Sequence, residues 1–161
     1  MDHYQQSFIA QAPAAGLYAA LTTPEGLRGW WTQECEVATA VGGTNHFRFG
    51  GTHKAMRIER LEPDREVRWL CTAAHIDLDQ LTHKDEWVGT QLVFHLAPDG
   101  QGQTRLDFEH RGLVPACECY DLCSNGWRYF LGSLRRFVET GHGTPYERGG
   151  SCQAKSETRS E

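Results

Sequence analysis

The N-terminal part of the chain has a strand pattern followed by two helical ones. Over residues 3–11 apolar side chains stand among polar ones, which predicts a half-buried strand. Over residues 13–21 the apolar positions recur at helical spacing, and the leading proline suits the first turn of a helix because it has no amide to leave unpaired. Thr23-Pro24 then provides a cap and a first position for a second short helix that ends at Trp30-Trp31.

The middle of the chain alternates with period two and has no helical pattern. Glycine, proline and aspartate divide it into strand-like runs over residues 34–41, 44–50, 53–61, 66–74, 86–96 and 104–111. Short links between consecutive runs predict an antiparallel meander. Within the runs, apolar side chains alternate with mostly polar ones, so one face of the sheet should meet water and the other a core.

The helical period returns over residues 117–140, which predicts the longest helix, ended by Gly141. Its broad apolar stripe must cover the apolar face of the sheet. We therefore predict an α+β domain with a helix-grip fold, in which a curved antiparallel sheet of about seven strands, in the order β-α-α-β6-α, wraps around a long C-terminal helix. We expect residues 1–143 to form this single domain and the polar residues 144–161 to be a disordered tail that contains Cys152.

Composition narrows the class of protein. The chain has 161 residues and a net charge of -5, which fits one globular domain and argues against a broad surface for nucleic acid. It lacks an apolar run long enough for a membrane span and an N-terminal signal pattern, so we expect a cytoplasmic protein without a membrane partner. The six cysteines are then expected to be reduced thiols.

The predicted inner face is rich in large flat side chains with a few small or polar ones among them. These residues either fill a dry core or line a mostly apolar pocket of the kind that binds small molecules. The candidate pocket residues are Phe47, Phe49, Met56, Trp69, Phe94, Phe108, His110, Cys123, Trp127 and Leu131.

Several segments together resemble the SRPBCC (START-like) superfamily, and more closely its bacterial members that are similar to the activator of heat-shock-protein-90 ATPase or to polyketide cyclases. The segments are Gly26-Leu27-Arg28-Gly29-Trp30-Trp31, Trp87-Val88-Gly89-Thr90, residues 104–115, Cys119-Tyr120 with Cys123, Gly126-Trp127, Ser133-Leu134 and residues 139–143. The resemblance implies a seven-stranded sheet around the C-terminal helix and an internal pocket that the superfamily uses for lipids, sterols, polyketides or plant hormones. It does not imply a reaction, because this fold hosts binders and enzymes alike.

Two residues are the candidates for acid–base chemistry. His110 ends the last strand on the inward parity, where a neutral imidazole could exchange a proton with a ligand, and Glu86 is in phase with the same face. The alternative is a core histidine hydrogen-bonded to its neighbours. The position of Trp87 stays open, because its parity is opposite to that of the strand that follows.

Three cysteines, Cys117, Cys119 and Cys123, open the long helix, where the helix dipole lowers a thiol pKa. Cys119 and Cys123, four residues apart, could ligate a metal with His110 or Cys117, but the spacing is not that of a common zinc site, so we expect buried small side chains and no metal. The glycine pairs lack the pattern of nucleotide-binding loops, so we expect no cofactor.

Three hypotheses for function follow. The first is binding of a hydrophobic or amphipathic small molecule, such as a lipid, polyketide or aromatic metabolite, between the sheet and the C-terminal helix. The second is a cyclase-, dehydratase- or hydrolase-like enzyme that uses His110. The third is a co-chaperone-like ATPase activator that acts by protein contact. The sequence is compatible with a homodimer and, through the family resemblance, with a chaperone partner.

Overall fold

One sheet and three helices make up the part of the chain that the computed structural model describes, residues 3–147. The chain runs through β1 (Tyr4–Ala10), α1 (Ala14–Thr22), α2 (Pro24–Trp30), β2 (Glu34–Glu36), β3 (Thr44–Phe49), β4 (Thr52–Glu62), β5 (Glu66–His75), β6 (Gln91–Pro98), β7 (Thr104–Arg111) and α3 (Tyr120–Thr140). None of these helices is long and apolar enough to cross a membrane.

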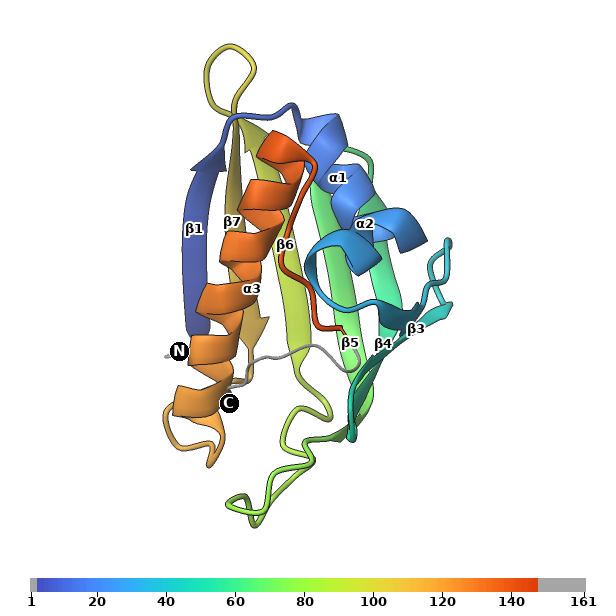
Figure 1. Cartoon of the computed structure of the whole chain (residues 1–161), viewed down its shortest axis with the longest axis vertical. Coiled ribbons are helices and arrows are strands. Elements are labelled where there is room, and N and C mark those ends of the chain that lie inside the picture. The colour runs from blue at the N-terminus through green and yellow to red at the C-terminus, as the bar shows by residue number, and fades with distance from the viewer. Residues whose placement is uncertain (1–2, 148–161) are drawn as a thin grey trace.

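The seven strands form one antiparallel sheet in the order β1-β7-β6-β5-β4-β3-β2. All three helices lie on the same side of the sheet, with α3 crossing β1, β7 and β6 while α1 and α2 cover β5 and its neighbours (Figure 1). The predicted helix-grip fold is therefore confirmed, including its seven strands and its long C-terminal helix.

Local sequence sets the helix boundaries. Thr23 caps α2, because its Oγ1 accepts a hydrogen bond of 3.0 Å from the Gly26 amide, and Pro24 occupies the first turn as expected. Gly141 ends α3 in the left-handed conformation, at φ 87°, which an L side chain rarely adopts. The start of α3 differs from the prediction by one turn, because residues 117–119 form turns before the helix begins at Tyr120.

Two predicted strands are shorter than expected. The first run of the meander is regular only over Glu34–Glu36. The run predicted to begin at Glu86 begins at Gln91, because residues 85–90 fold into consecutive turns with Gly89 at φ 88°. Strand pairing needs extended backbone, so these turns leave residues 86–90 in a loop.

The first residues of the predicted tail are held against the domain. The Tyr146 amide donates to the Trp31 carbonyl at 2.8 Å, the Tyr146 carbonyl accepts from the Gln33 amide at 3.0 Å, and the Thr144 amide donates to Ser133 Oγ at 2.7 Å. Residues 144–147 thus pack with the fold. The rest of the predicted tail, residues 148–161 with Cys152, lies outside the described residues.

The apolar parity predicted for the strands matches the buried face of the sheet. Rings from the sheet and the helices pack against one another there, and Trp31 lies at their centre. Its ring centroid is 4.4 Å from that of Phe47, 5.4 Å from that of Trp127 and 6.2 Å from that of Trp69. The predicted pocket residues belong to this network or border it.

Candidate functional site

The curved sheet and α3 together form the grip of this fold. The polar residues of its inner face lie at the end where α3 begins. At this end, the long connection between β5 and β6, residues 76–90, reaches the first turn of α3 (Figure 1). The Gly89 amide donates to the Cys71 carbonyl at 2.8 Å and the Cys71 amide donates to the Thr90 carbonyl at 2.9 Å, so the connection returns to β5 before β6 starts. This return turns Trp87 inward, where it is 3% exposed.

Two glutamates fasten the connection to α3. The Glu86 carboxylate accepts the amides of Glu118 and Cys119 at 3.0 and 3.1 Å, which satisfies donors that precede the helix. The Glu118 carboxylate in return accepts the amides of His83 and Thr82 at 2.7 and 2.9 Å, and these bonds lower the pKa of its carboxyl group. The reciprocal bonds fix the position of Trp87 relative to the helix.

His110 lies deep in this end of the grip, 0% exposed, and both its ring nitrogens have partners. Nδ1 accepts the Trp127 indole N–H at 3.0 Å, so the ring proton belongs on Nε2, which lies 2.8 Å from Thr90 Oγ1. The Thr90 hydroxyl donates onward to the Trp87 carbonyl at 2.6 Å. Desolvation, with smaller contributions from Lys54 and His3, lowers the pKa of His110 to about 3, so the imidazole is neutral at ordinary pH.

The predicted acid–base pair is not brought together. Within residues 3–147 no hydrogen bond or ion pair joins Glu86 to His110, because Glu86 binds the α3 amides and His110 binds Thr90 and Trp127. Neither ring nitrogen is left free to exchange a proton with a ligand. The arrangement is that of a histidine held in the core.

Lys54 is the residue of this site that sequence reasoning missed. It lies opposite Phe47 of β3 and Ala74 of β5, both buried, and residues opposite each other share a face of the sheet. Its Nζ stands 3.7 Å from the centroid of the Trp87 ring and 5.0 Å from that of Phe49. A cation over an aromatic face gains roughly 0.5–2 kcal/mol, depending on its exposure to water.

Lys54 is half-buried, and within residues 3–147 no carboxylate pairs with it. Desolvation lowers the pKa of its ammonium, and the nearby thiols of Cys123 and Cys71 oppose that shift. Lys54 has the inward parity, because it lies two residues before Met56, which the sequence places on the inner face. Judged by residue type alone, however, a charged lysine is expected on the surface.

Three buried thiols lie close enough to this lysine to interact with its charge. Desolvation raises the pKa of Cys71 to about 11, and a hydrogen bond to Cys123 together with desolvation raises that of Cys119. The pKa of Cys123 is lowered, first by the Cys119 hydrogen bond and then by Lys54 and the Trp87 indole N–H, which lies 3.2 Å from its sulfur. Cys123 is therefore the most acidic of the three thiols. Within the described part of the chain, no three His, Cys, Asp or Glu side chains are placed to share a metal ion.

The ten predicted pocket residues share the inner side of the grip. Nine are buried and Phe49 is half-buried. Trp87 joins them, since its ring stacks on Trp127 with centroids 5.7 Å apart and stands edge-on to His110 at 4.5 Å. The inner face thus has a ring-packed middle and, beside it, an end where an ammonium faces two aromatic rings.

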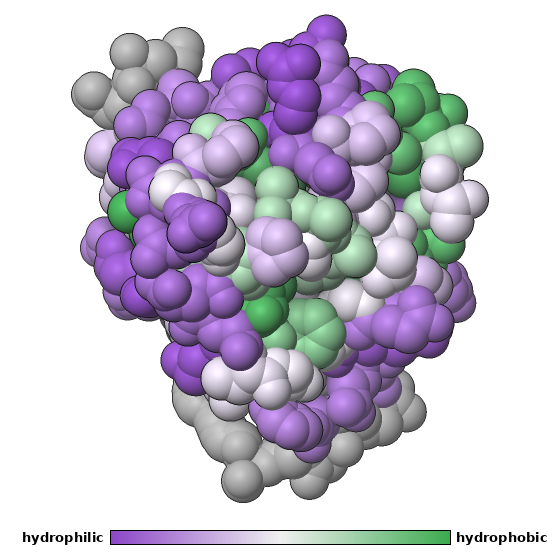
Figure 2. Space-filling view, turned by 90° about the horizontal axis from the view of Figure 1, so that it is seen from above, coloured by the Kyte–Doolittle hydropathy of each residue, from purple (hydrophilic) through white to green (hydrophobic). Residues whose placement is uncertain are grey.

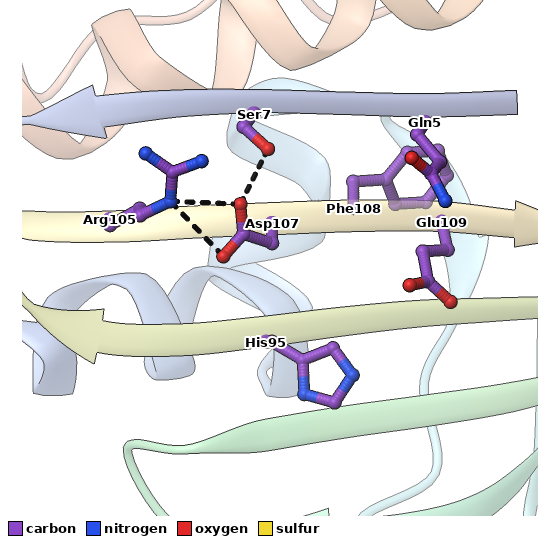
Figure 3. Close-up of a pocket in the computed structure, with 7 residues that line it drawn as sticks. All are labelled: Gln5, Ser7, His95, Arg105, Asp107, Phe108 and Glu109. Atoms are coloured by element: carbon purple, nitrogen blue, oxygen red, sulfur yellow. Dashed lines mark hydrogen bonds and ion pairs between the residues drawn. The ribbon is translucent and has the colours of Figure 1, made fainter.

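A separate hollow of about 380 Å³ lies on the opposite, outer face of the sheet (Figure 3). It is lined by Gln5, Ser7, His95, Arg105, Asp107, Phe108 and Glu109. Its central polar groups bind one another, since Asp107 accepts from Ser7 at 2.5 Å and from Arg105 at 3.0 Å. This mutual pairing leaves the outer hollow a weaker candidate than the Lys54 end of the grip.

Comparison with solved structures identifies close likenesses of fold. The chain is 29% identical to a protein from Colwellia psychrerythraea described as an Aha1 dimer, with a TM-score of 0.75 and coverage of 89% of this chain and 100% of that one. A protein from Mesorhizobium loti, MLL2253, is 23% identical, with a TM-score of 0.68 over 84% of this chain and 96% of that one. DynU16, a putative protein of the dynemicin biosynthetic locus, is 21% identical, with a TM-score of 0.66 over 89% of this chain and 49% of that one.

No curated protein matches the chain significantly. A family model does match it, over residues 11–139, from α1 to the last turn of α3. The matched segment includes the sheet from β2 to β7, the connection that carries Trp87, and Lys54. The chain therefore belongs to the Activator of Hsp90 ATPase homolog 1-like protein family.

Proposed function

We propose that the protein binds an amphipathic small molecule at the end of the grip where Lys54 faces Trp87. One observation carries this proposal: an aromatic inner face ends beside an inward ammonium that no carboxylate within residues 3–147 neutralises. Small-molecule sites usually combine an apolar wall with a few convergent polar groups. The rings of Trp87 and Phe49 form such a wall, and Lys54 is the polar group.

The connection over residues 76–90 supports the same proposal. Ligand sites are often bordered by irregular segments held on a rigid scaffold. Here Glu86 and Glu118 anchor the connection to α3, while the Lys84 ammonium donates to the carbonyls of Leu78 and Leu81, both at 2.6 Å. A molecule seated on Lys54 would lie between this connection and the sheet.

Two neighbouring alanines of β5 offer a matched test. Ala74 is buried and lies opposite Lys54, whereas Ala73 is exposed. The protein is purified from its own host and examined by native mass spectrometry, followed by identification of any molecule released on denaturation. We expect the wild type and Ala73→Leu to retain a small amphipathic molecule and Ala74→Leu to lose it. A wild type that is empty and gains no thermal stability from a panel of amphipathic ligands would refute the proposal.

The enzymatic hypothesis has less support, because its acid–base candidate, His110, has both ring nitrogens occupied. A second candidate function is action on an Hsp90-type ATPase, which the family description favours. It predicts faster ATP turnover when the protein is mixed with such an ATPase from the same host. Unchanged turnover and no complex on a sizing column would refute it.

A homodimer is supported by the Colwellia psychrerythraea relative, which is described as a dimer. Helix α1 contains no charged residue, with Ala15 and Ala19 exposed, and the end of the molecule where α1 lies has an apolar area at its centre (Figure 2). Such a face suits a contact between two copies. Light scattering should give a dimer for the wild type and a monomer for Ala19→Glu, and a wild-type monomer at high concentration would contradict this.

A further inference from the structure

Of the polar side chains described above at the Lys54 end of the grip, the ammonium of Lys54 is the one left to bind a ligand. His110 and Thr90 are saturated by each other, by Trp127 and by the Trp87 carbonyl. The Trp87 indole N–H is taken by a sulfur atom. The ammonium of Lys54, by contrast, makes no hydrogen bond within residues 3–147, and an ammonium has three donors and no acceptor.

We propose, on the basis of the binding function proposed above, that the ligand is a monoanion whose carboxylate pairs with Lys54 and whose aromatic or aliphatic body lies against Trp87 and Phe49. An anionic acceptor supplies the counter-charge that no side chain of residues 3–147 provides. A hydrogen bond between charged groups is also stronger than one between neutral groups, especially where water is partly excluded.

The surroundings favour a carboxylate over a phosphate. A phosphate monoester carries close to two negative charges and is usually bound by arginines or by free amides at a helix N-terminus. The amides of Glu118 and Cys119 at the start of α3 are already occupied by Glu86. One ammonium matches a single negative charge, and the aromatic rings beside it match a flat or extended apolar body.

The state of the lysine agrees with this assignment. Desolvation lowers the pKa of its ammonium, and the titratable groups near it on other elements are the thiols of Cys71 from β5 and of Cys119 and Cys123 at the start of α3, together with the neutral ring of His110 from β7. A bound carboxylate would restore the stabilisation that desolvation removes from the charged form. Ligand binding and protonation of Lys54 are therefore coupled, and each favours the other.

Two probes that differ only in the head group test the inference. Naphthalene carboxylate and naphthalenemethanol are titrated calorimetrically into the full chain and into the variants Lys54→Met and Arg57→Met. Arg57 is the matched control, because it lies on the same strand, is exposed on the outer face and pairs with Glu59 at 2.9 Å. The wild type should prefer the carboxylate by about tenfold or more, as expected for one charge-assisted hydrogen bond.

Lys54→Met should abolish this preference by weakening the carboxylate alone, while Arg57→Met should retain it. If both probes bind and the preference is absent, or survives in Lys54→Met, the inference fails and the proposed binding function stands. If neither these probes nor decanoate and decanol bind, the proposed function fails as well. Near-ultraviolet circular dichroism checks the fold, and Lys54→Gln replaces Lys54→Met if the latter does not fold.

Discussion

The two faces of the sheet differ in whether their cationic side chains are paired with carboxylates. On the outer face arginines are paired with carboxylates: Arg57 with Glu59 at 2.9 Å, and Arg111 with Glu109 at 2.7 Å. On the inner face Lys54 stands over aromatic rings, and no carboxylate within residues 3–147 reaches it. Exposed pairs add about 0–1 kcal/mol each, whereas an unpaired cation that leaves water is destabilising. A charge kept in the unfavourable position points to binding rather than to stability.

The largest expected effect tests the packed middle of the inner face. Trp31→Ala should lower the free energy of unfolding by about 3–5 kcal/mol, because Trp31 contacts Phe47, Trp69 and Trp127 and its loss leaves a cavity. Tyr129→Ala removes a ring that is 54% exposed and should change the free energy of unfolding by less than about 0.5 kcal/mol. Both values come from chemical denaturation, and equal losses would contradict the assignment of Trp31 to the core.

The second prediction concerns pH. Unfolding returns the pKa of His110 from about 3 to 6.5, so the unfolded chain binds more protons between these values and stability falls as pH falls through this window. The contribution of His110 to the loss is about 2 kcal/mol between about pH 6.5 and about pH 5. The His110→Gln variant should have a lower free energy of unfolding than the wild type at neutral pH. Below neutral pH, this free energy should change less with pH than that of the wild type. Parallel pH profiles for the wild type and the variant would show that His110 is not buried as a neutral ring.

The third prediction separates the connection from the packed middle. Glu86→Gln should cost about 1–2 kcal/mol, because the neutral amide accepts the two α3 amides less strongly. It should also increase amide hydrogen exchange over residues 76–90 more than in β6 or β7. Asp85→Asn, an exposed neighbour, is the control. Equal protection in the two variants would mean that Glu86 does not hold the connection.

The smallest expected effect is a gain. Lys54→Met should raise the free energy of unfolding by about 1 kcal/mol, because it replaces a desolvated cation with an apolar side chain of similar length. Arg57→Met on the outer face should stay within about 0.5 kcal/mol of the wild type. Greater stability with weaker ligand binding is the trade-off expected of a functional residue. A clear loss of stability would instead assign Lys54 a structural role.

Periodicity predicted the fold well because each strand must place one apolar set on one face. It identified the inner residues of β7, such as Phe108 and His110, and the stripe of α3 that meets them. It failed over residues 86–90, where an apolar residue, Trp87, enters the core from a turn rather than from a strand. A residue that enters the core from a turn gives no periodic signal in the sequence. The position of Trp87 therefore depends on the backbone hydrogen bonds of Gly89 and Thr90 to β5.

The candidate site could be predicted only in part. The apolar wall followed from alternation, but the pairing of Glu86 with the α3 amides depends on a contact between residues more than thirty positions apart. Lys54 had the correct parity, yet residue type alone gives no reason to place a lysine opposite Phe47 without a carboxylate beside it. Its position required the register of three neighbouring strands.

The most direct test of the Lys54 site is the nuclear magnetic resonance signal of the lysine side chains. The chain contains only Lys54, Lys84 and Lys155, so carbon-13 labelling of lysine gives few and assignable Cε signals. The Lys54 signal should be shifted by the ring current of Trp87 and should move, with a rise in the pKa of its ammonium, as naphthalene carboxylate is added, while that of Lys84 stays in place. A Lys54 signal that shows no ring-current shift and does not change when the carboxylate binds would contradict the proposed Lys54 site.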